Sequence, residues 1–149
     1  MTIDEERKED GWRRANIGRL LNNAAECFEK RVLQLLAERD HCHVSPAHLH
    51  LTRNLDLAGT RLTELARRAS MTKQAMSEIV AQCEALGLIH RIADPTDSRA
   101  KIVLFSQPGL EWLDAFRQAL EQAEREMEEQ LEPDAMPLIK KALIKYADL

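Results

Sequence analysis

Four polar side chains lie together at the start of an amphipathic segment that runs to Leu86. They are Thr72, Lys73, Gln74 and Ser77, and none of them is acidic. Gln can form a bidentate pair with adenine in the major groove of DNA, and Lys can donate to guanine. When two helices are joined by a tight turn, the second helix can present such residues to base edges. These four residues are therefore candidates for direct contact with duplex DNA.

A second group of candidates lies in and beside the loop Ala93–Arg99, which separates two β-prone runs. The loop is rich in turn-forming residues and contains Asp97 and Arg99, and Lys101 follows on the next run. Two short runs joined by such a loop predict a β-hairpin. A cation at a hairpin tip beside DNA can enter the minor groove, where the negative potential is strong. We therefore expect Asp97, Arg99 and Lys101 to take part in DNA binding.

A third cluster has the residue types of a metal or redox site. The tripeptide His41-Cys42-His43 is followed closely by His48 and His50. Thiolate and imidazole are ligands for Zn²⁺, and an accessible thiolate can sense oxidants. Because adjacent ligands are not a zinc-finger spacing, the favoured prediction is a structural helix junction with no metal and no cofactor. A metal- or redox-responsive regulator is the alternative. Cys27 and Cys83 fall on apolar stripes and are expected to be packed thiols.

Helical periodicity begins upstream of these groups. Apolar residues recur at steps of three, four or seven between Trp12 and Leu35, which predicts one long helix over about residues 12–40. Ser45-Pro46 then resembles an N-cap followed by Pro at the first helical position. This pair predicts a short helix that ends near Asn54.

The segment that carries the DNA-binding candidates predicts two short helices and the hairpin. Thr63 is expected to cap a helix Glu64–Ala69, and Thr72 to cap a helix from Lys73 to about Leu86. Gly87 lies where a left-handed residue often ends a helix. The inward positions are expected to be Leu65 and Ala66 on the first helix, and Ala75, Met76, Ile79, Val80, Cys83 and Leu86 on the second. The β-prone runs are Leu88–Ile92 and Ala100–Phe105.

A long helix is predicted after Ser106, which is a plausible N-cap. It runs to about Leu131 and has a glutamate-rich face opposite its apolar stripe. The stripe includes Leu113, Phe116, Leu120 and Met127. Because a small head cannot cover so long a stripe, we expect a partner subunit to cover it. A final helix follows Pro133 and Pro137.

These elements predict a mainly α fold with a small β-hairpin wing, which is a winged helix-turn-helix. We expect a single domain over residues 1–149. Within it, residues 45–106 form the DNA-binding head, and residues 12–40 and 107–149 form helices for homodimerisation.

The charge distribution fits this division. The net charge is −4, but residues 45–105 contain 8 basic and 6 acidic residues, whereas residues 106–149 contain 5 basic and 10 acidic ones. A local basic surplus is what matters for binding a polyanion. No apolar run is long enough to span a membrane, and the charged N-terminus does not resemble a signal peptide. We expect a cytoplasmic protein without a membrane partner.

Residues 61–101 resemble the MarR family of bacterial regulators. The shared features are the LTELA helix start, the TKQAMSEIV helix, the EALGLI exit and the DPTDSRAK wing. One departure is Ser106-Gln107-Pro108-Gly109, which replaces the Leu-Thr-x-x-Gly that is more usual in the family. Pro108 falls in the first helical turn, where proline is tolerated.

The resemblance implies a dimeric transcription regulator that binds a pseudo-palindromic operator on double-stranded DNA and usually represses transcription. It implies that Asp97 holds Arg99 by an ion pair so that the arginine can enter the minor groove. It also implies a small-molecule effector, often an organic anion, that binds between the helical stem and the head and releases the DNA.

Two other functional classes are weighed against this one. A winged helix can serve as a protein-interaction module, but the chemistry of Lys73-Gln74 and of the wing suits phosphate and base contacts better. An enzyme is not expected, because the sequence contains no phosphate-binding glycine loop and no nucleophile motif.

Overall fold

The computed structural model describes residues 10–41 and 43–149, which form two compact units. One unit is Leu33–Gln122, which we call the head unit. The other contains the described residues up to Val32 together with Ala123–Leu149, which we call the terminal unit. The described chain is mainly helical and has one small antiparallel sheet, as predicted. No helix within the described ranges is long and apolar enough to cross a membrane.

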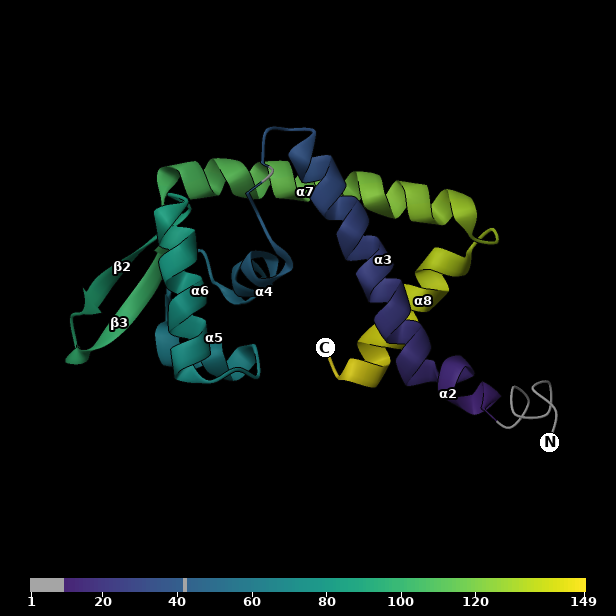
Figure 1. The fold of residues 1–149 in the computed structure, drawn as a ribbon, viewed down its shortest axis with the longest axis horizontal. Helices are drawn as coiled ribbons and strands as arrows, with labels where there is room; N and C mark the ends of the chain where they lie inside the picture. The colour runs from purple at the N-terminus through teal and green to yellow at the C-terminus, as the bar shows by residue number, and fades with distance from the viewer. Residues whose placement is uncertain (1–9, 42) are drawn as a thin grey trace. The chain divides into compact units, whose positions relative to one another are not determined.

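The head unit contains a helix-turn-helix followed by a wing (Figure 1). Helix α5 (Leu62–Arg68) leads through a tight turn, in which Ser70 has a φ of 53°, to α6 (Lys73–Ala85). The hairpin of β2 (Ile89–Asp94) and β3 (Asp97–Phe105) follows directly. A two-residue strand, β1 (Thr60–Arg61), pairs with β3, so the strand order is β1-β3-β2. The winged helix-turn-helix predicted from the sequence is confirmed.

The ends of α6 follow the local sequence signals. The Thr72 hydroxyl accepts the backbone N–H of Ala75 at 3.1 Å and caps the helix. Gly87 adopts a φ of 77° just past the C-cap, a conformation that favours glycine. The buried face consists of Met76, Ile79, Val80 and Cys83. Leu86 was expected on this face but is 38% exposed, because it lies at the C-cap beyond the packed turns.

Helix α5 begins earlier than predicted. Its first residue is Leu62, Arg61 is the N-cap, and no side chain caps it, so the predicted cap at Thr63 is wrong. The reason is a tertiary contact: β1 pairs with β3 up to Arg61, so the helix begins at the residue that directly follows the strand. Leu65 and Ala66 face inward, as expected.

Helix α4 (Pro46–Asn54) has the predicted start. The Ser45 hydroxyl accepts the backbone N–H of His48, and the His48 ring in turn accepts the backbone N–H of Ser45 at 3.1 Å. This reciprocal pair satisfies two helix-end donors. Pro46 occupies the first turn, where its missing N–H costs nothing.

Helix α7 (Gln107–Gln130) starts at a close packing point. The Ser106 hydroxyl donates to the carbonyl of Gly87 and accepts the Gly109 backbone N–H at 3.0 Å. A Cβ added at Gly109 would lie 1.8 Å from the Leu88 carbonyl oxygen. Glycine is therefore required here by the backbone of the preceding strand region.

We expect Gly109→Ala to lower the free energy of unfolding by at least about 2 kcal/mol, because backbone atoms must move to admit the methyl group. Urea unfolding followed by circular dichroism measures this loss. Gly11→Ala is the control, since a Cβ at Gly11 would meet no atom within 4 Å. Equal stability of the two variants would show that the contact is not tight.

The apolar stripe of α7 is partly covered within the chain. Trp112 and Phe116 stack with ring centroids 5.2 Å apart, and they are 1% and 5% exposed. The expectation that Phe116 awaits a partner subunit is therefore wrong. The sequence showed the stripe but not the residues of the head unit that pack in the same core.

The terminal unit contains α2 (Gly11–Ala15), most of α3 (Ile17–Ala37), the end of α7 and α8 (Ala135–Ala147). Asn16 has an extended backbone between α2 and α3, so the single helix predicted from Trp12 is interrupted. Its side-chain amide donates to the Trp12 carbonyl at 2.9 Å, and its side-chain oxygen accepts the Arg19 N–H at 3.0 Å. One residue thus closes one helix and opens the next.

Much of the apolar surface of the terminal unit is exposed. The large exposed side chains are Trp12, Ile17, Leu20, Leu21, Leu138, Leu143, Ile144, Tyr146 and Leu149. Cys27 is also exposed, so the expectation of a packed thiol there is wrong for the single chain. Within the unit, Arg31 pairs with Glu126 at 2.7 Å and Lys140 with Glu124 at 2.7 Å.

Candidate nucleic-acid interface

The N-terminal end of α6 presents the predicted polar residues at the surface. Thr72, Lys73 and Gln74 are exposed, and Ser77, one turn further along, is half-buried. Because the opposite face of α6 is packed in the core, its polar end is fixed in orientation. The helix can therefore approach a groove of duplex DNA as a rigid element.

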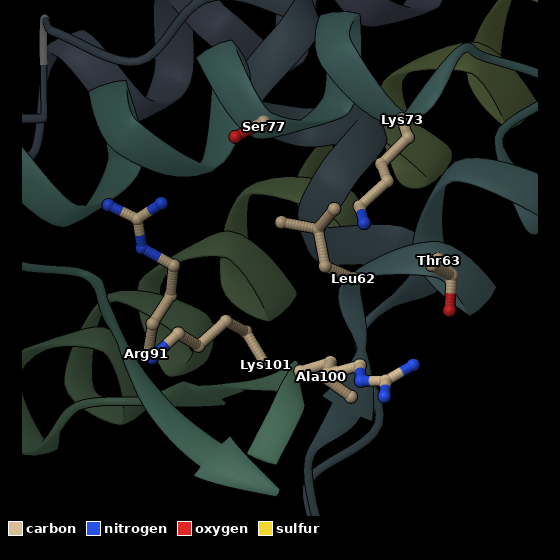
Figure 2. A pocket seen from close by; sticks show the side chains of 8 residues that line it. Leu62, Thr63, Lys73, Ser77, Arg91, Ala100 and Lys101 are labelled. Atoms are coloured by element: carbon tan, nitrogen blue, oxygen red, sulfur yellow. The ribbon is translucent and has the colours of Figure 1, made fainter. Parts of the chain in front are cut away.

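A pocket of about 140 Å³ lies between α6 and the wing. Figure 2 shows Lys73 and Ser77 coming from the helix, and Arg91 and Lys101 coming from the strands. The lining residues are Leu62, Thr63, Lys73, Ser77, Arg91, Arg99, Ala100 and Lys101. Four of them are cationic, two carry a hydroxyl and none is acidic. The pocket surface is thus suited to an anionic group.

The structure brings together four of the seven residues predicted to bind DNA. Lys73, Ser77, Arg99 and Lys101 line this pocket, whereas Thr72, Gln74 and Asp97 do not. Arg91 was not among the seven residues predicted from the sequence, and the pocket adds it to the site. No local signal identifies Arg91, because its neighbours come from another element.

The cations of the site differ in their partners. Arg91 is held by Glu84 of α6, with an ion pair of 3.1 Å, and its backbone N–H also donates to that carboxylate. The Arg91 side chain lowers the pKa of Glu84. Within the described residues, Lys73, Arg99 and Lys101 are exposed and form no ion pair. Their charges remain available to a polyanion.

The arginines of α5 are different. Arg67 donates twice to Glu64, at 2.8 and 2.5 Å, and Arg68 contacts both Glu64 and Asp56. The hydrogen bonds from Arg67 contribute most to lowering the pKa of Glu64 to about 2. These arginines are therefore neutralised locally, unlike Lys73 on α6 and Arg99 and Lys101 on the wing, which form no ion pair within the described residues.

The structure does not show the ion pair predicted between Asp97 and Arg99 in the wing. The Asp97 carboxylate accepts the backbone N–H of Arg99 at 3.0 Å, and in the described chain no ion pair joins the two side chains. This contact is an Asx-turn, which shapes the backbone and leaves the guanidinium free. The short sequence spacing favoured the backbone N–H because it lies nearer to the carboxylate than the end of the arginine side chain.

A second aspartate at the wing was missed in the sequence analysis. Asp94 ends β2, its side chain is only 5% exposed, and it pairs with Arg61 at 2.5 Å. Thr96 donates to the same carboxylate through its backbone N–H and its hydroxyl, both at 2.8 Å. The Asp-Pro-Thr sequence indicates a turn, but nothing in it indicates a partner at position 61.

The histidines connect helices of the head. The His48 ring accepts from Ser45 and lies 3.0 Å from the side-chain oxygen of Gln82 on α6, so both ring nitrogens are used. His50 contacts the Ala69 carbonyl at 3.2 Å. Cys42 lies outside the described residues. Among those described, no three potential ligands gather around a metal position.

The thiol of Cys83 behaves as predicted from its apolar stripe. It is fully buried in the head core, and burial raises its pKa to about 11. A thiol with so high a pKa contains almost no thiolate at neutral pH. Its packing role is confirmed.

Comparisons with known proteins agree with the fold. The model of the MarR family matches residues 44–100. A mutant of E. coli MarR complexed with operator DNA has a TM-score of 0.74, 18% identity, and coverage of 91% of this chain and 96% of that one. The S. aureus MepR–DNA complex has a TM-score of 0.70 and 19% identity, and the match covers 89% of this chain and 97% of that one. PcaV from Streptomyces coelicolor in complex with its natural ligand has a TM-score of 0.67 and 16% identity, and the match covers 90% of this chain and 93% of that one. At these identities the likeness shows a shared fold. No curated protein sequence matches the chain.

Proposed function

The chain carries the MarR-family signature in residues 44–100 and has the MarR winged-helix fold, and from this we propose that it is a sequence-specific regulator of transcription that binds duplex DNA. The observation that carries the proposal is the surface formed by α6 and the wing. There, Lys73, Arg99 and Lys101 have no ion-pair partner within the described chain, and Gln74 is exposed beside them. The proposed activity is binding, without a catalytic step.

The geometry supports different roles for α6 and the wing in DNA binding. The N-terminal end of α6 would enter the major groove, where Gln74 can pair with adenine and Lys73 can donate to guanine or a phosphate. Arg99 on the wing would enter the adjacent minor groove. Thr72 and Ser77 are hydroxyl donors suited to the phosphates between the two grooves.

We propose that the protein acts as a homodimer. The terminal unit exposes Ile17, Leu138, Ile144 and other large apolar side chains, which water contacts unless a second copy covers them. A two-fold dimer would present two heads to two inverted half-sites, about one helical turn apart. In this proposal residues 12–40 and 107–149 supply the dimer helices and residues 45–106 supply the head.

We further propose repression that a small-molecule effector relieves. The support is the family signature, together with the PcaV structure, which holds that protein's natural ligand. An effector would act by binding better to the chain free of DNA than to the DNA-bound chain. Transcription from a promoter that contains the operator should fall when the protein is added, and a rise would assign activation instead.

The binding proposal is tested by selecting duplexes from random DNA with the wild-type protein. The expected result is enrichment of one pseudo-palindromic sequence. Recovery of DNA without a common sequence would reduce the function to non-specific binding. Recovery of no DNA would favour a winged helix that binds protein.

Gln74→Ala is expected to relax the base preference at one position of each half-site, at a cost of about 1–3 kcal/mol, because a bidentate contact would be lost. Repeating the selection with the variant measures this change. Gln107→Ala, at an exposed position on α7, is the control and should leave the selected sequence unchanged. An unchanged sequence with Gln74→Ala would remove Gln74 from base recognition.

A further inference from the structure

The turn of the wing lies beyond the regular pairing of the sheet. Strand β1 ends at Arg61, opposite Ile102, and the register of β2 with β3 shifts between Ala93 and Asp94. The hairpin then reverses through Pro95 and Thr96. Asp94 is still paired with Asp97 across the turn, but the ladder next to it is irregular, so side-chain contacts add to what fixes the turn.

Those contacts converge on one carboxylate. One oxygen of Asp94 accepts both the backbone N–H and the hydroxyl of Thr96, and the other accepts from the Arg61 guanidinium at 2.5 Å. Arg61 also donates to the Thr96 hydroxyl at 3.2 Å. Three residues thus form a closed set of hydrogen bonds in which the acidic group is almost fully buried.

Arg61 links this set of hydrogen bonds to the helix-turn-helix. It is the N-cap residue of α5, and the next residue, Leu62, is buried and lines the pocket beside Lys73. A guanidinium with planar, fixed donors is suited to hold a carboxylate in one orientation. The turn is therefore connected to the helix-turn-helix by a direct side-chain bridge as well as by β3.

The bridge also neutralises a charge that would oppose DNA binding. Asp94 lies three residues before Asp97 in a loop that carries Arg99 and Lys101 toward the same surface. A free carboxylate there would repel phosphates, and the hydrogen bonds from the Thr96 backbone N–H and hydroxyl, with a smaller contribution from Arg61, hold the pKa of Asp94 below its usual value. The acid is kept ionised, but it is buried and paired.

We propose that Arg61 and Asp94 are positioning residues that fix the wing turn relative to α6, so that Arg99 reaches the minor groove while Gln74 is in the major groove. This inference rests on the proposed function. It assigns a role to two residues that need not touch DNA themselves. Fixing the turn before binding lowers the ordering cost of the complex.

The test compares Arg61→Gln and Asp94→Asn with wild type by ¹⁵N relaxation of the free protein. The expected result is rigid amides at Thr96–Ala100 in wild type and order parameters below about 0.6 in both variants. Arg67→Gln is the matched control, because it also removes an ion-paired arginine of the helix-turn-helix, but from the last turn of α5, away from the wing turn contacts. Unchanged order parameters would overturn the proposal, whether or not the protein binds DNA.

DNA binding gives the second readout. Each variant is expected to bind the selected duplex about tenfold more weakly and to keep the same preference at the position that Gln74 contacts. The double variant should bind no more weakly than either single one, because both break the same bridge. Additive losses, or a mobile wing with unchanged affinity, would overturn the positioning role. If Asp94→Asn does not fold, Arg61→Gln carries the test, since Arg61 is 47% exposed.

Discussion

Replacing Lys73 and Arg99 together by alanine is expected to weaken binding to the selected duplex by at least about a hundredfold at low salt and to reduce the salt slope by about 4 for a dimer. Each subunit loses two cations that have no ion partner within the described chain. Each lost phosphate contact also removes the release of its counterions. Fluorescence anisotropy at several salt concentrations measures both quantities.

The matched control is Arg67→Ala with Arg117→Ala. It removes the same formal charge, but Arg67 is paired with Glu64, and Arg117 with Asp114 and Glu121. We expect the control to keep most of the affinity and of the salt slope. Equal losses in the two variants would mean that net charge alone, rather than the α6–wing surface, determines binding.

Ile17→Glu combined with Leu138→Glu is expected to convert the proposed dimer into a monomer. Both side chains are large, apolar and more than two-thirds exposed on the terminal unit, at 69% and 67%. Burying two carboxylates in an apolar interface carries a cost that the contact cannot offset. Sedimentation equilibrium should change from twice the 17.0 kDa of one chain to the single mass.

The monomer should also bind the selected duplex about 10²–10⁴-fold more weakly, because the second head no longer binds at a high effective concentration. Leu57→Glu is the control, since Leu57 is also 69% exposed but lies in the head unit. It should leave the mass and affinity unchanged. A double variant that remains dimeric would place the interface elsewhere on the chain.

The parts of the fold that follow local chemistry could be predicted from the sequence. Ser45 with Pro46 starts α4, Thr72 caps α6, and Gly87 ends it with a positive φ. Each of these signals acts within a few residues, so no knowledge of the rest of the chain is needed. The helix-turn-helix and the hairpin were therefore predictable.

The parts that depend on distant partners were not predictable. The pairing of β1 with β3 joins segments about 40 residues apart, and α5 begins at Leu62, directly after the paired Arg61, rather than at the predicted Glu64. The Asp94 carboxylate is paired with Arg61, 33 residues earlier, and the spacing of neither residue indicates it. Periodicity identified the stripe of α7 but could not show that Phe116 packs in the head core.

At the candidate site, too, local features could be predicted from the sequence, whereas contacts between distant residues could not. Exposed polar residues at the start of α6 follow from its capping and amphipathicity, so Lys73 and Gln74 were accessible to sequence reasoning. The pocket that joins Lys73 to Arg91, Arg99 and Lys101 depends on how the hairpin packs against α6. Which cations are free and which are neutralised by Glu84 or Glu64 is likewise a property of the folded chain.

The salt dependence of DNA affinity tests the central claim most directly. The wild-type protein is titrated into the selected duplex and into a scrambled duplex of equal length between about 50 and 200 mM salt. We predict that the logarithm of Kd rises linearly with the logarithm of salt concentration for both. We also predict that the selected duplex is bound at least about 10³-fold more tightly throughout. A Kd that does not change with salt, or that is equal for the two duplexes, would contradict recognition of DNA by α6 and the wing.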